Sequence, residues 1–491
     1  MFQKSFLFSF IFFIAASFSA QAQTGPRLTQ NQFQVFVQSP QNFQAIQNYM
    51  VWLKKNDYDI AGVRWQEGKI EVITNQSGLD RLNQYRVPYV VVRTHGPRNS
   101  GPGIESTDKI DPRYLNPQKV EEKLRKIAAQ YPNDTRLEQI GKSHQGRPIF
   151  ALLLSKNAKR NDMNYLNKPT LVFDGMHHAR EIMTSEIVMD VADVVLSMKR
   201  TNSQWNQLIE SWNIWIVPML NVDGNNIVWT ENNWWRKNAR ANGANIHGVD
   251  LNRNYSYAWN ACSGSSGSMS SDTYRGPSAA SEPETQALMK LGYMAYPTAS
   301  LSYHSYSELV LYPYGCQGAL TGENNLHQKI ATELAKMLPS DSNRGTYTAG
   351  TPWKLLYSVD GDSMGFMHSE FGALAFTFEV NQSFQPAYEV REPTLLKHRK
   401  AWAYFVQRMS QNMLSLKVVS AARMQPLEAT VAISGVIKNK GEKPLRTNAA
   451  GNLFKVLDPG VYTLDVRLAD GRAKQIQVQM TGAPQAQIVS F

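Results

Sequence analysis

The feature that most constrains the fold is an alternation of strand-like apolar runs with helical patterns between residues 114 and 417. TLVFDGM, NIWIVPML and ALAFTFEV are rich in β-branched and aromatic residues, as buried strands are. Segments with helical spacing separate or follow them, among them SEIVMDVADVVLSM and the closing PTLLKHRKAWAYFVQRM. The first helix is marked by Asn116 as N-cap and Pro117 at the first helical position. This alternation predicts an α/β domain with a mostly parallel or mixed central β-sheet flanked by helices.

Two smaller units are predicted to flank this domain. Residues 23–100 are predicted to form a small α/β domain, since strand patterns such as QFQVFVQ and GKIEVIT surround the helical spacing of NFQAIQNYMVWLKK. Residues 101–113 belong to a stretch rich in Gly, Pro and Ser and are predicted as a linker. Residues 424–491 alternate apolar and polar residues with period two and contain the turn sequences DPG and ADG, which predicts a small all-β sandwich domain.

Residues 1–22 predict a secretory signal peptide. Lys4 precedes the apolar run FLFSFIFFIAASFSA, and AQA offers small residues for cleavage before Gln23. A membrane anchor is the alternative, but the run is short for a span and leads directly into polar residues. No later segment is apolar enough to cross a bilayer, so we expect a protein without a membrane span, exported to the periplasm or the cell exterior.

Charge and cysteine usage exclude several other kinds of protein. The formal net charge is +11, but no long Lys/Arg run concentrates it, so we expect no nucleic-acid partner. The only cysteines are Cys262 and Cys316, which excludes a disulfide scaffold and a zinc site built from cysteines. Whether these two form a single disulfide is left open by the sequence.

Candidate metal ligands follow the first apolar run. In DGMHHARE, His178 and Glu181 lie at the end of a predicted strand and ahead of a helix, where α/β proteins bind their ligands. The spacing to Glu181 permits His177 as well as His178, and a solvated polar turn is the common alternative for such a short motif. His304, in LSYHSYSELVLYPYG, offers a third donor, and three protein ligands are what a catalytic zinc ion requires.

Four further residues carry groups suited to peptide chemistry. Arg236 in WWRKNAR, and Asn252 and Arg253 in GVDLNRNY, are cationic and amide groups that suit carboxylates and oxyanions. Glu379 ends the apolar run FTFEV, where a carboxylate is costly unless it is paired or functional. Exposed ion pairs and an edge position are the alternatives for these residues taken singly.

In their order, these motifs resemble those of the zinc metallocarboxypeptidases of the carboxypeptidase A and T type. The resemblance covers roughly residues 112–415 and includes H-x-x-E, W-R-K, N-R-N, H-S-Y-S and F-T-F-E, with IGKSHQGRPIFALLLS and YRGPSAASEPE around them. It implies the carboxypeptidase-like fold and one Zn²⁺ ion. It further implies these roles: His178, Glu181 and His304 as zinc ligands, Arg236 as stabiliser of the oxyanion, Asn252 and Arg253 as binders of the substrate's terminal carboxylate, and Glu379 as general base and acid.

The resemblance also implies residues that close and shape the substrate pocket. Counting back from Glu379 without a gap places the family's mobile tyrosine at Tyr357, for which a packing aromatic is the alternative. The position that usually decides specificity corresponds to Met364, which implies apolar or aromatic C-terminal residues. Asp362 resembles the carboxypeptidase T pattern and leaves acceptance of Lys and Arg open.

The flanking units fit the same family. Residues 23–100 resemble the α/β pro-domain of a proenzyme, to be cut by an activating protease at Arg93, Arg98 or Arg113, with a permanent accessory domain as the alternative. LDPGVYTLDVRL resembles the transthyretin-like β-sandwich of some carboxypeptidases. Cys262 lies near a family disulfide, but the usual partner position corresponds to Ser270, so that bridge is not expected, and Cys316 is expected near the pocket.

The implied function is that of a secreted, monomeric zinc carboxypeptidase acting on peptides and proteins with a free C-terminus. Two alternatives stay open. One is a cell-wall peptidase of the same superfamily that trims peptidoglycan stem peptides. The other is an inactive relative that only binds peptides, although no ligand or base of the family set is missing here.

Overall fold

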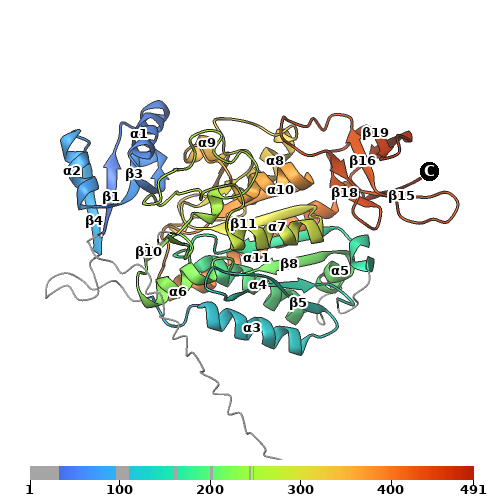
Figure 1. Cartoon of the computed structure of the whole chain (residues 1–491), viewed down its shortest axis with the longest axis horizontal. Helices are drawn as coiled ribbons and strands as arrows, with labels where there is room; N and C mark the ends of the chain where they lie inside the picture. Colours follow the sequence, from blue (N-terminus) through green and yellow to red (C-terminus); the bar gives the residue numbers. More distant parts are fainter. Residues whose placement is uncertain (1–31, 96–109, 159–162, 200–202, 243–244, 247) are drawn as a thin grey trace, which may run out of the picture.

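The computed structural model of the protein describes residues 32–95, 110–158, 163–199, 203–242, 245–246 and 248–491. The predicted signal peptide, Arg98 and most of the predicted linker lie outside these residues. Three parts follow one another along the long axis of the molecule: an N-terminal sheet unit, a central α/β unit and a C-terminal β unit (Figure 1). Among the described residues, no helix is long and apolar enough to cross a membrane.

The N-terminal unit, residues 32–95, is a four-stranded antiparallel sheet in the order β2-β3-β1-β4 with two helices. The side chain of Asn42 caps the first helix by accepting a hydrogen bond from the backbone N–H of Ala45. The apolar face of that helix packs on the sheet, as its spacing predicts. The elements are β1 (Gln32–Gln38), α1 (Phe43–Lys55), β2 (Asp59–Arg64), η1 (Trp65–Glu67), β3 (Lys69–Asn75), α2 (Gln76–Gln84) and β4 (Tyr89–His95).

The central unit is built on an eight-stranded mixed sheet in the order β13-β12-β14-β11-β7-β8-β6-β5. Its first half comprises α3 (Pro117–Gln130), β5 (Thr135–Lys142), β6 (Pro148–Leu154), η2 (Met163–Asn167), β7 (Thr170–Gly175), α4 (Met183–Met198), α5 (Ser203–Ser211), β8 (Asn213–Val217), α6 (Val222–Thr230), β9 (Ala241–Asn242), β10 (Asn245–Ile246) and η3 (Leu251–Arg253). Its second half comprises α7 (Pro283–Ala295), β11 (Ala299–His304), β12 (Leu309–Leu311), α8 (Asn324–Lys336), β13 (Thr348–Gly350), α9 (Pro352–Leu355), α10 (Ser363–Phe371), β14 (Leu374–Glu379), η4 (Tyr388–Val390) and α11 (Arg391–Ser410).

The middle of this sheet positions the site. Strands β14, β11, β7 and β8 run parallel, and their residues are almost all buried, because helices cover both faces of the sheet. β12 and β6 pair antiparallel with the outer members of this group, which makes the sheet mixed, as predicted. The carboxyl ends of β7, β11 and β14 therefore meet at one edge, where α/β proteins place their ligands.

The C-terminal β unit has two sheets, β18-β15-β21 and β17-β16-β19-β20, which share one apolar core and form the predicted sandwich. It starts earlier than the sequence pattern indicates. Helix α11 ends at Ser410, and β15 pairs with β18 and β21, so the predicted boundary at residue 417 falls inside a strand of this unit. The strands are β15 (Met413–Val419), β16 (Ala429–Ile433), β17 (Leu445–Arg446), β18 (Asn452–Val456), β19 (Gly460–Leu468), β20 (Ala473–Met480) and β21 (Gln485–Ser490).

Candidate active site

Three potential metal ligands meet at the carboxyl ends of neighbouring strands. His178 and Glu181 follow β7, and His304 is the last residue of β11, which pairs with β7 in parallel. Nδ1 of His178 lies 2.7 Å from Oε1 of Glu181 and 3.1 Å from Nδ1 of His304. Nδ1 of His304 lies 3.1 Å from the second oxygen of Glu181. All three side chains are buried, and their donor atoms converge on one point.

This donor set fits a zinc ion. Bonds of about 2.0–2.2 Å place the ligand atoms of a tetrahedral zinc site roughly 3.3 Å apart, close to the separations found here. Oδ1 of Asp250 lies 3.1 Å from Nε2 of His178, which fixes the ring with Nδ1 turned toward the other ligands. Burial raises the pKa of Glu181, but His178 and His304 lower it by more, so the net pKa is below its usual range and the carboxylate stays ionised. Two imidazoles and one carboxylate leave a fourth position open, as in catalytic zinc sites.

His177, the other histidine of the motif, faces away from the ligand atoms. Its Nε2 lies 2.8 Å from the hydroxyl of Tyr255, and its Nδ1 lies 3.3 Å from Oδ1 of Asp174. Burial lowers the pKa of His177 well below its usual value, so the ring is neutral. The structure therefore brings His178, rather than His177, to the metal site.

A permanent cation stands beside the ligands. Nη2 of Arg236 lies 2.9 Å from Oδ2 of Asp250, and its Nη1 lies 3.9 Å from Oε1 of Glu181. Burial alone would lower the pKa of Arg236, but Asp250 and Asp59 raise it by more, so the guanidinium keeps its charge. Such a group can meet negative charge that develops on a substrate oxygen.

Glu379 lies next to this donor set and lines the same cavity. It ends β14 and is the register partner of His304 on the adjacent parallel strand. Burial and the neighbouring Glu181 raise the pKa of Glu379 well above its usual range. A raised pKa suits a carboxyl group that takes and returns a proton.

The candidate carboxylate-binding residues line the same cavity. Asn252 and Arg253 end the short helix η3, and Nη2 of Arg253 lies 3.4 Å from the hydroxyl of Tyr357. The side-chain oxygen of Asn252 accepts a hydrogen bond from the backbone N–H of Ser363 at 2.9 Å. Gly361 has φ +67° and would place a Cβ 2.5 Å from the carbonyl oxygen of Arg253, so this close approach requires glycine.

The two predicted specificity residues lie where α10 begins. Met364 is in the first turn and is buried at the cavity wall. Asp362 is the N-cap of α10, and its Oδ1 accepts a hydrogen bond from the backbone N–H of Gly365 at 2.7 Å. Asp362 thus lines the cavity and also supports the helix that carries Met364.

The N-terminal unit covers this cavity. Ile60 and Ala61 of β2 line it together with His178, Glu181, Glu379 and Arg253, and the cavity volume is about 50 Å³. Residues of the N-terminal unit therefore form part of the cavity wall.

A buried ion pair joins the two units beside the metal ligands. Nη2 of Arg180, the residue before Glu181, donates to Oδ2 of Asp59 in β2 at 2.5 Å. Both side chains are almost fully buried. The guanidinium carbon of Arg180 also lies 4.1 Å from the centre of the Phe384 ring.

A second charged residue of the N-terminal unit lies over the ring of Tyr357. Nζ of Lys54 in α1 lies 4.7 Å from the ring centre of Tyr357 and 3.3 Å from the hydroxyl oxygen of Thr273. Burial, followed by the charges of Arg253 and Arg236, lowers the pKa of Lys54 to about 7.

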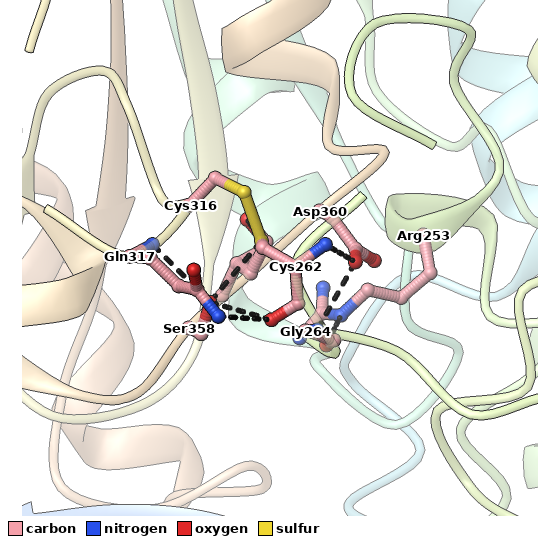
Figure 2. Close-up of a disulfide and its surroundings, with 8 residues drawn as sticks. Arg253, Cys262, Gly264, Cys316, Gln317, Ser358 and Asp360 are labelled. Atoms are coloured by element: carbon pink, nitrogen blue, oxygen red, sulfur yellow. Dashed lines mark hydrogen bonds between the residues drawn. A yellow bond between two sulfur atoms is a disulfide. The ribbon is translucent and has the colours of Figure 1, made fainter. Parts of the chain in front are cut away.

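The two cysteines, whose pairing the sequence left open, form a disulfide next to Arg253 (Figure 2). Cys316 lies 54 positions after Cys262 in the sequence. The family bridge, whose second position corresponds to Ser270, is therefore not the one formed here. The expectation that Cys316 lies near the pocket agrees with this position.

Sequence reasoning missed three residues of the site. Asp250 orients both His178 and Arg236. The sequence offered a signal for it, because an acidic residue between the apolar residues of GVDLNRNY is expected to be exposed unless it is paired. Asp59 and Lys54 carried no local signal, because their partners lie in another unit of the chain.

Comparison with known sequences agrees with this geometry. A family model described as zinc carboxypeptidase matches residues 120–399, which is more than half of the chain. Metallocarboxypeptidase A of Arthroderma otae is 35% identical over 239 residues, covering 47% of this chain and 55% of that protein. Carboxypeptidase B of Bos taurus is 28% identical over 282 residues, covering 56% and 65%. The chain thus spans little more than half the length of the first of these curated relatives.

Solved structures support the fold. Carboxypeptidase A from Helicoverpa armigera matches with a TM-score of 0.64 at 22% identity, covering 78% of this chain and 98% of that one. Thrombin-activatable fibrinolysis inhibitor matches with a TM-score of 0.61 at 23% identity, covering 77% and 98%. Both matches extend over more of the chain than the central unit alone.

Proposed function

The chain belongs to the zinc carboxypeptidase family, and we propose that it hydrolyses the C-terminal peptide bond of peptides and proteins. One observation carries this proposal. A buried His₂Glu donor set, a carboxyl group with a raised pKa and the Asn252–Arg253 pair line a single cavity.

The Asn252–Arg253 pair supports an exopeptidase. A guanidinium can bind a free α-carboxylate through two parallel hydrogen bonds, and an internal peptide bond offers no carboxylate at that place. Tyr357 lies close enough to Arg253 to cover a substrate bound there.

The remaining residues have separate tasks in the reaction. When bound by His178, Glu181 and His304, zinc supplies Lewis-acid activation of the attacking water and of the scissile carbonyl. Glu379 takes the proton of the water and returns it to the leaving amine. Arg236 meets the negative charge that develops on the carbonyl oxygen in the transition state.

The N-terminal unit is proposed to act as a pro-domain, in a chain exported by its signal peptide. The small size of the covered cavity supports inhibition of the uncleaved chain. Arg113, one of the predicted cleavage positions, is exposed and paired with Asp111 and Glu389. For specificity, Met364 supports a preference for apolar or aromatic C-terminal residues, and Asp362 leaves Lys and Arg as possible substrates.

Hydrolysis of blocked dipeptides that end in Phe, Leu, Lys or Arg tests the proposal. The full chain is assayed before and after limited proteolysis near residue 100, with and without 1,10-phenanthroline. We expect chelator-sensitive release of the C-terminal residue that rises after proteolysis and falls about 10³-fold in Glu379→Gln. Glu392→Gln, the same exchange at an exposed position of α11, is the control. No release by folded, metal-loaded protein would contradict the proposal and shift weight to a cell-wall peptidase or a peptide-binding relative.

The zinc content of two neighbouring variants tests the ligand assignment independently of activity. His178→Ala is expected to lose the one bound zinc ion per chain, because it removes a ligand. His177→Ala is expected to retain it, since His177 faces Tyr255 and Asp174. Equal zinc contents in the two variants would contradict the assignment.

A further inference from the structure

Three chain segments meet next to Arg253. We call residues 262–264, 314–317 and 357–360 together the carboxylate-site junction (Figure 2). The disulfide joins the first segment to the second. The backbone N–H of Val359 donates to the carbonyl of Gly315 at 2.9 Å and so joins the second segment to the third.

Asp360 connects the junction to Arg253. Its Oδ2 accepts hydrogen bonds from the backbone N–H groups of Cys262 at 3.1 Å and Gly264 at 3.0 Å. The carbonyl of Gly264 in turn accepts a hydrogen bond from Nε of Arg253 at 3.2 Å, as Figure 2 shows. The position of the guanidinium therefore depends on where residues 262–264 are held.

The C-terminal β unit holds the junction from the other side. The hydroxyl of Tyr314 donates to Oε1 of Glu442 at 2.7 Å, and the Glu442 side chain is fully enclosed. Tyr314 is itself buried and stacks on Tyr257 at 4.8 Å between ring centres. Tyr257 follows Arg253 by four residues, so the same tyrosine pair borders the carboxylate-binding segment.

We propose that Glu442 of the C-terminal β unit is a positioning residue for the substrate's terminal carboxylate, acting on Arg253 through Tyr314 and the Cys262–Cys316 disulfide. The proposal rests on the proposed function in that it takes Arg253 as the carboxylate-binding residue. It gives the C-terminal β unit a part in substrate binding, although no residue of that unit lines the cavity.

The expected signature is a rise in KM without a change in kcat. Arg253 binds the carboxylate equally in the ground state and the transition state, so misplacing it removes uniform binding. Hydrolysis itself uses Glu379 and Arg236, neither of which belongs to the junction. A bidentate contact tolerates little displacement, so a shift of a few tenths of an ångström is enough to weaken it.

Steady-state kinetics of the proteolytically activated full chain test this. Tyr314→Phe removes only the hydroxyl and is expected to raise KM for a blocked dipeptide three- to tenfold with kcat within twofold. Glu442→Ala is expected to do the same, while Glu442→Gln, which keeps an acceptor oxygen, restores most of the wild-type KM. Asn439→Ala is the matched control, because Asn439 lies in the same loop and bonds to the carbonyl of Leu320 rather than to Tyr314.

A double-mutant cycle tests the route through the disulfide. The paired change Cys262→Ser and Cys316→Ser is expected to raise KM by itself. Adding Tyr314→Phe to it is expected to raise KM by less than twofold more, because the two changes interrupt one path. If the rises in KM caused by the two changes instead multiply in the combined variant, the route through the disulfide is wrong.

Binding of 3-phenylpropionate, measured by calorimetry, keeps the inference testable without catalysis. This carboxylate is expected to bind three- to tenfold more weakly to Tyr314→Phe than to wild type and equally well to Asn439→Ala. An inactive wild type that still shows this pattern would sink the proposed function and uphold the positioning role. Unchanged KM and unchanged binding in Tyr314→Phe and Glu442→Ala would overturn the positioning role, and so would a loss confined to kcat.

Discussion

The two flanking units both meet the central unit through buried charges, but they differ in what those charges touch. On the N-terminal side, Asp59 binds Arg180 next to a metal ligand, and Lys54 lies over Tyr357. These partners border the cavity in which a substrate would bind. Both contacts therefore lie next to residues that the proposed reaction uses, Glu181 in one case and Tyr357 in the other.

On the C-terminal side the buried charges lie outside the cavity. Lys455 binds Glu323 at 2.6 Å and the carbonyl of Gly372 at 2.8 Å, and both side chains of the ion pair are almost fully buried. Glu442 likewise meets Tyr314 behind the pocket. Substrate binding does not require any of these groups to be released.

The N-terminal unit therefore covers the cavity, whereas the C-terminal unit supports the central unit from outside it. In the proposed pro-domain role, docking of the N-terminal unit competes with substrate, so its buried charges would favour inhibition only while the unit stays attached. The contacts of the C-terminal unit are compatible with every step of the reaction, so they can be permanent. The following predictions test this contrast, starting with the largest expected effect.

Breaking the buried pair on the C-terminal side is expected to destabilise the fold strongly. Lys455→Met leaves the Glu323 carboxylate buried without its cation, which costs about 3–5 kcal/mol. Urea denaturation of the full chain measures the free energy of unfolding. Lys329→Met is the control, since the Lys329–Asp458 pair at 3.7 Å is largely exposed and is expected to contribute at most about 0.5 kcal/mol. Similar losses in the two variants would contradict a structural role for the buried pair.

Removing the cover is expected to raise activity about a hundredfold, which corresponds to about 2.7 kcal/mol. Residues of β2 line the cavity of about 50 Å³, so the docked unit is expected to hinder substrate binding. The measurement is kcat/KM on a blocked dipeptide before and after proteolysis near residue 100. The same proteolysis of Glu379→Gln controls for contaminating peptidases. Equal activity of cut and uncut chain would identify the N-terminal unit as a permanent accessory domain.

Weakening the cover without cutting the chain is expected to have a smaller effect. Asp59→Asn removes the charge that binds Arg180 but keeps the size of the side chain, so activity of the uncut chain is expected to rise about tenfold. Activity of the cut enzyme is expected to stay the same, as is that of the uncut Glu67→Gln, whose pair with Lys69 is largely solvent-accessible. An equal rise in cut and uncut Asp59→Asn would contradict a role in docking.

The same pair predicts resistance to mild acid. Burial raises the pKa of Asp59, but Arg180 and Arg236 lower it by more, so the net pKa lies below its usual value. A depressed carboxyl pKa contributes docking free energy above the unfolded pKa of about 3.9 and loses it only as the pH falls through the lower folded pKa. Acidification to pH 5 is therefore not expected to activate the uncut chain.

Sequence patterns predicted most of the fold because local periodicity reports burial. The runs that became β7, β8 and β14, and the cap that begins α3, each carry their signal within a few residues. No strand was predicted over β15, whose apolar residues follow α11 after only two residues.

The site was predictable where its residues belong to short motifs, and not where distant segments meet. The motifs supplied His178, Glu181 and Glu379, and the structure brings them to one edge of the sheet. Asp59 is 121 residues away from Arg180, and the disulfide closes a span of 54 residues. Contacts of this range depend on how complete units dock, which no local spacing encodes.

The smallest change that we expect to measure concerns Lys54 and the pH dependence of the cover. Burial and Arg253 lower the pKa of Lys54 to about 7 in the docked state, whereas a released lysine has a pKa of about 10.4. Between these values the released state binds one more proton, so docking strengthens as the pH rises from about 7 toward 10.4. A step from pH 7 to pH 8 is expected to strengthen docking about fivefold.

The ratio of uncut to cut activity isolates this effect, because titration of the catalytic groups changes both activities alike. In the wild type the ratio is expected to fall about fivefold from pH 7 to pH 8. In Lys54→Met the titrating group is gone, so the ratio is expected to be flat and lower than that of the wild type at pH 7. Lys69→Met, which changes an exposed lysine of the same unit, is expected to keep the wild-type slope. A flat ratio in the wild type would mean that Lys54 keeps its proton in the docked state, and would contradict this prediction.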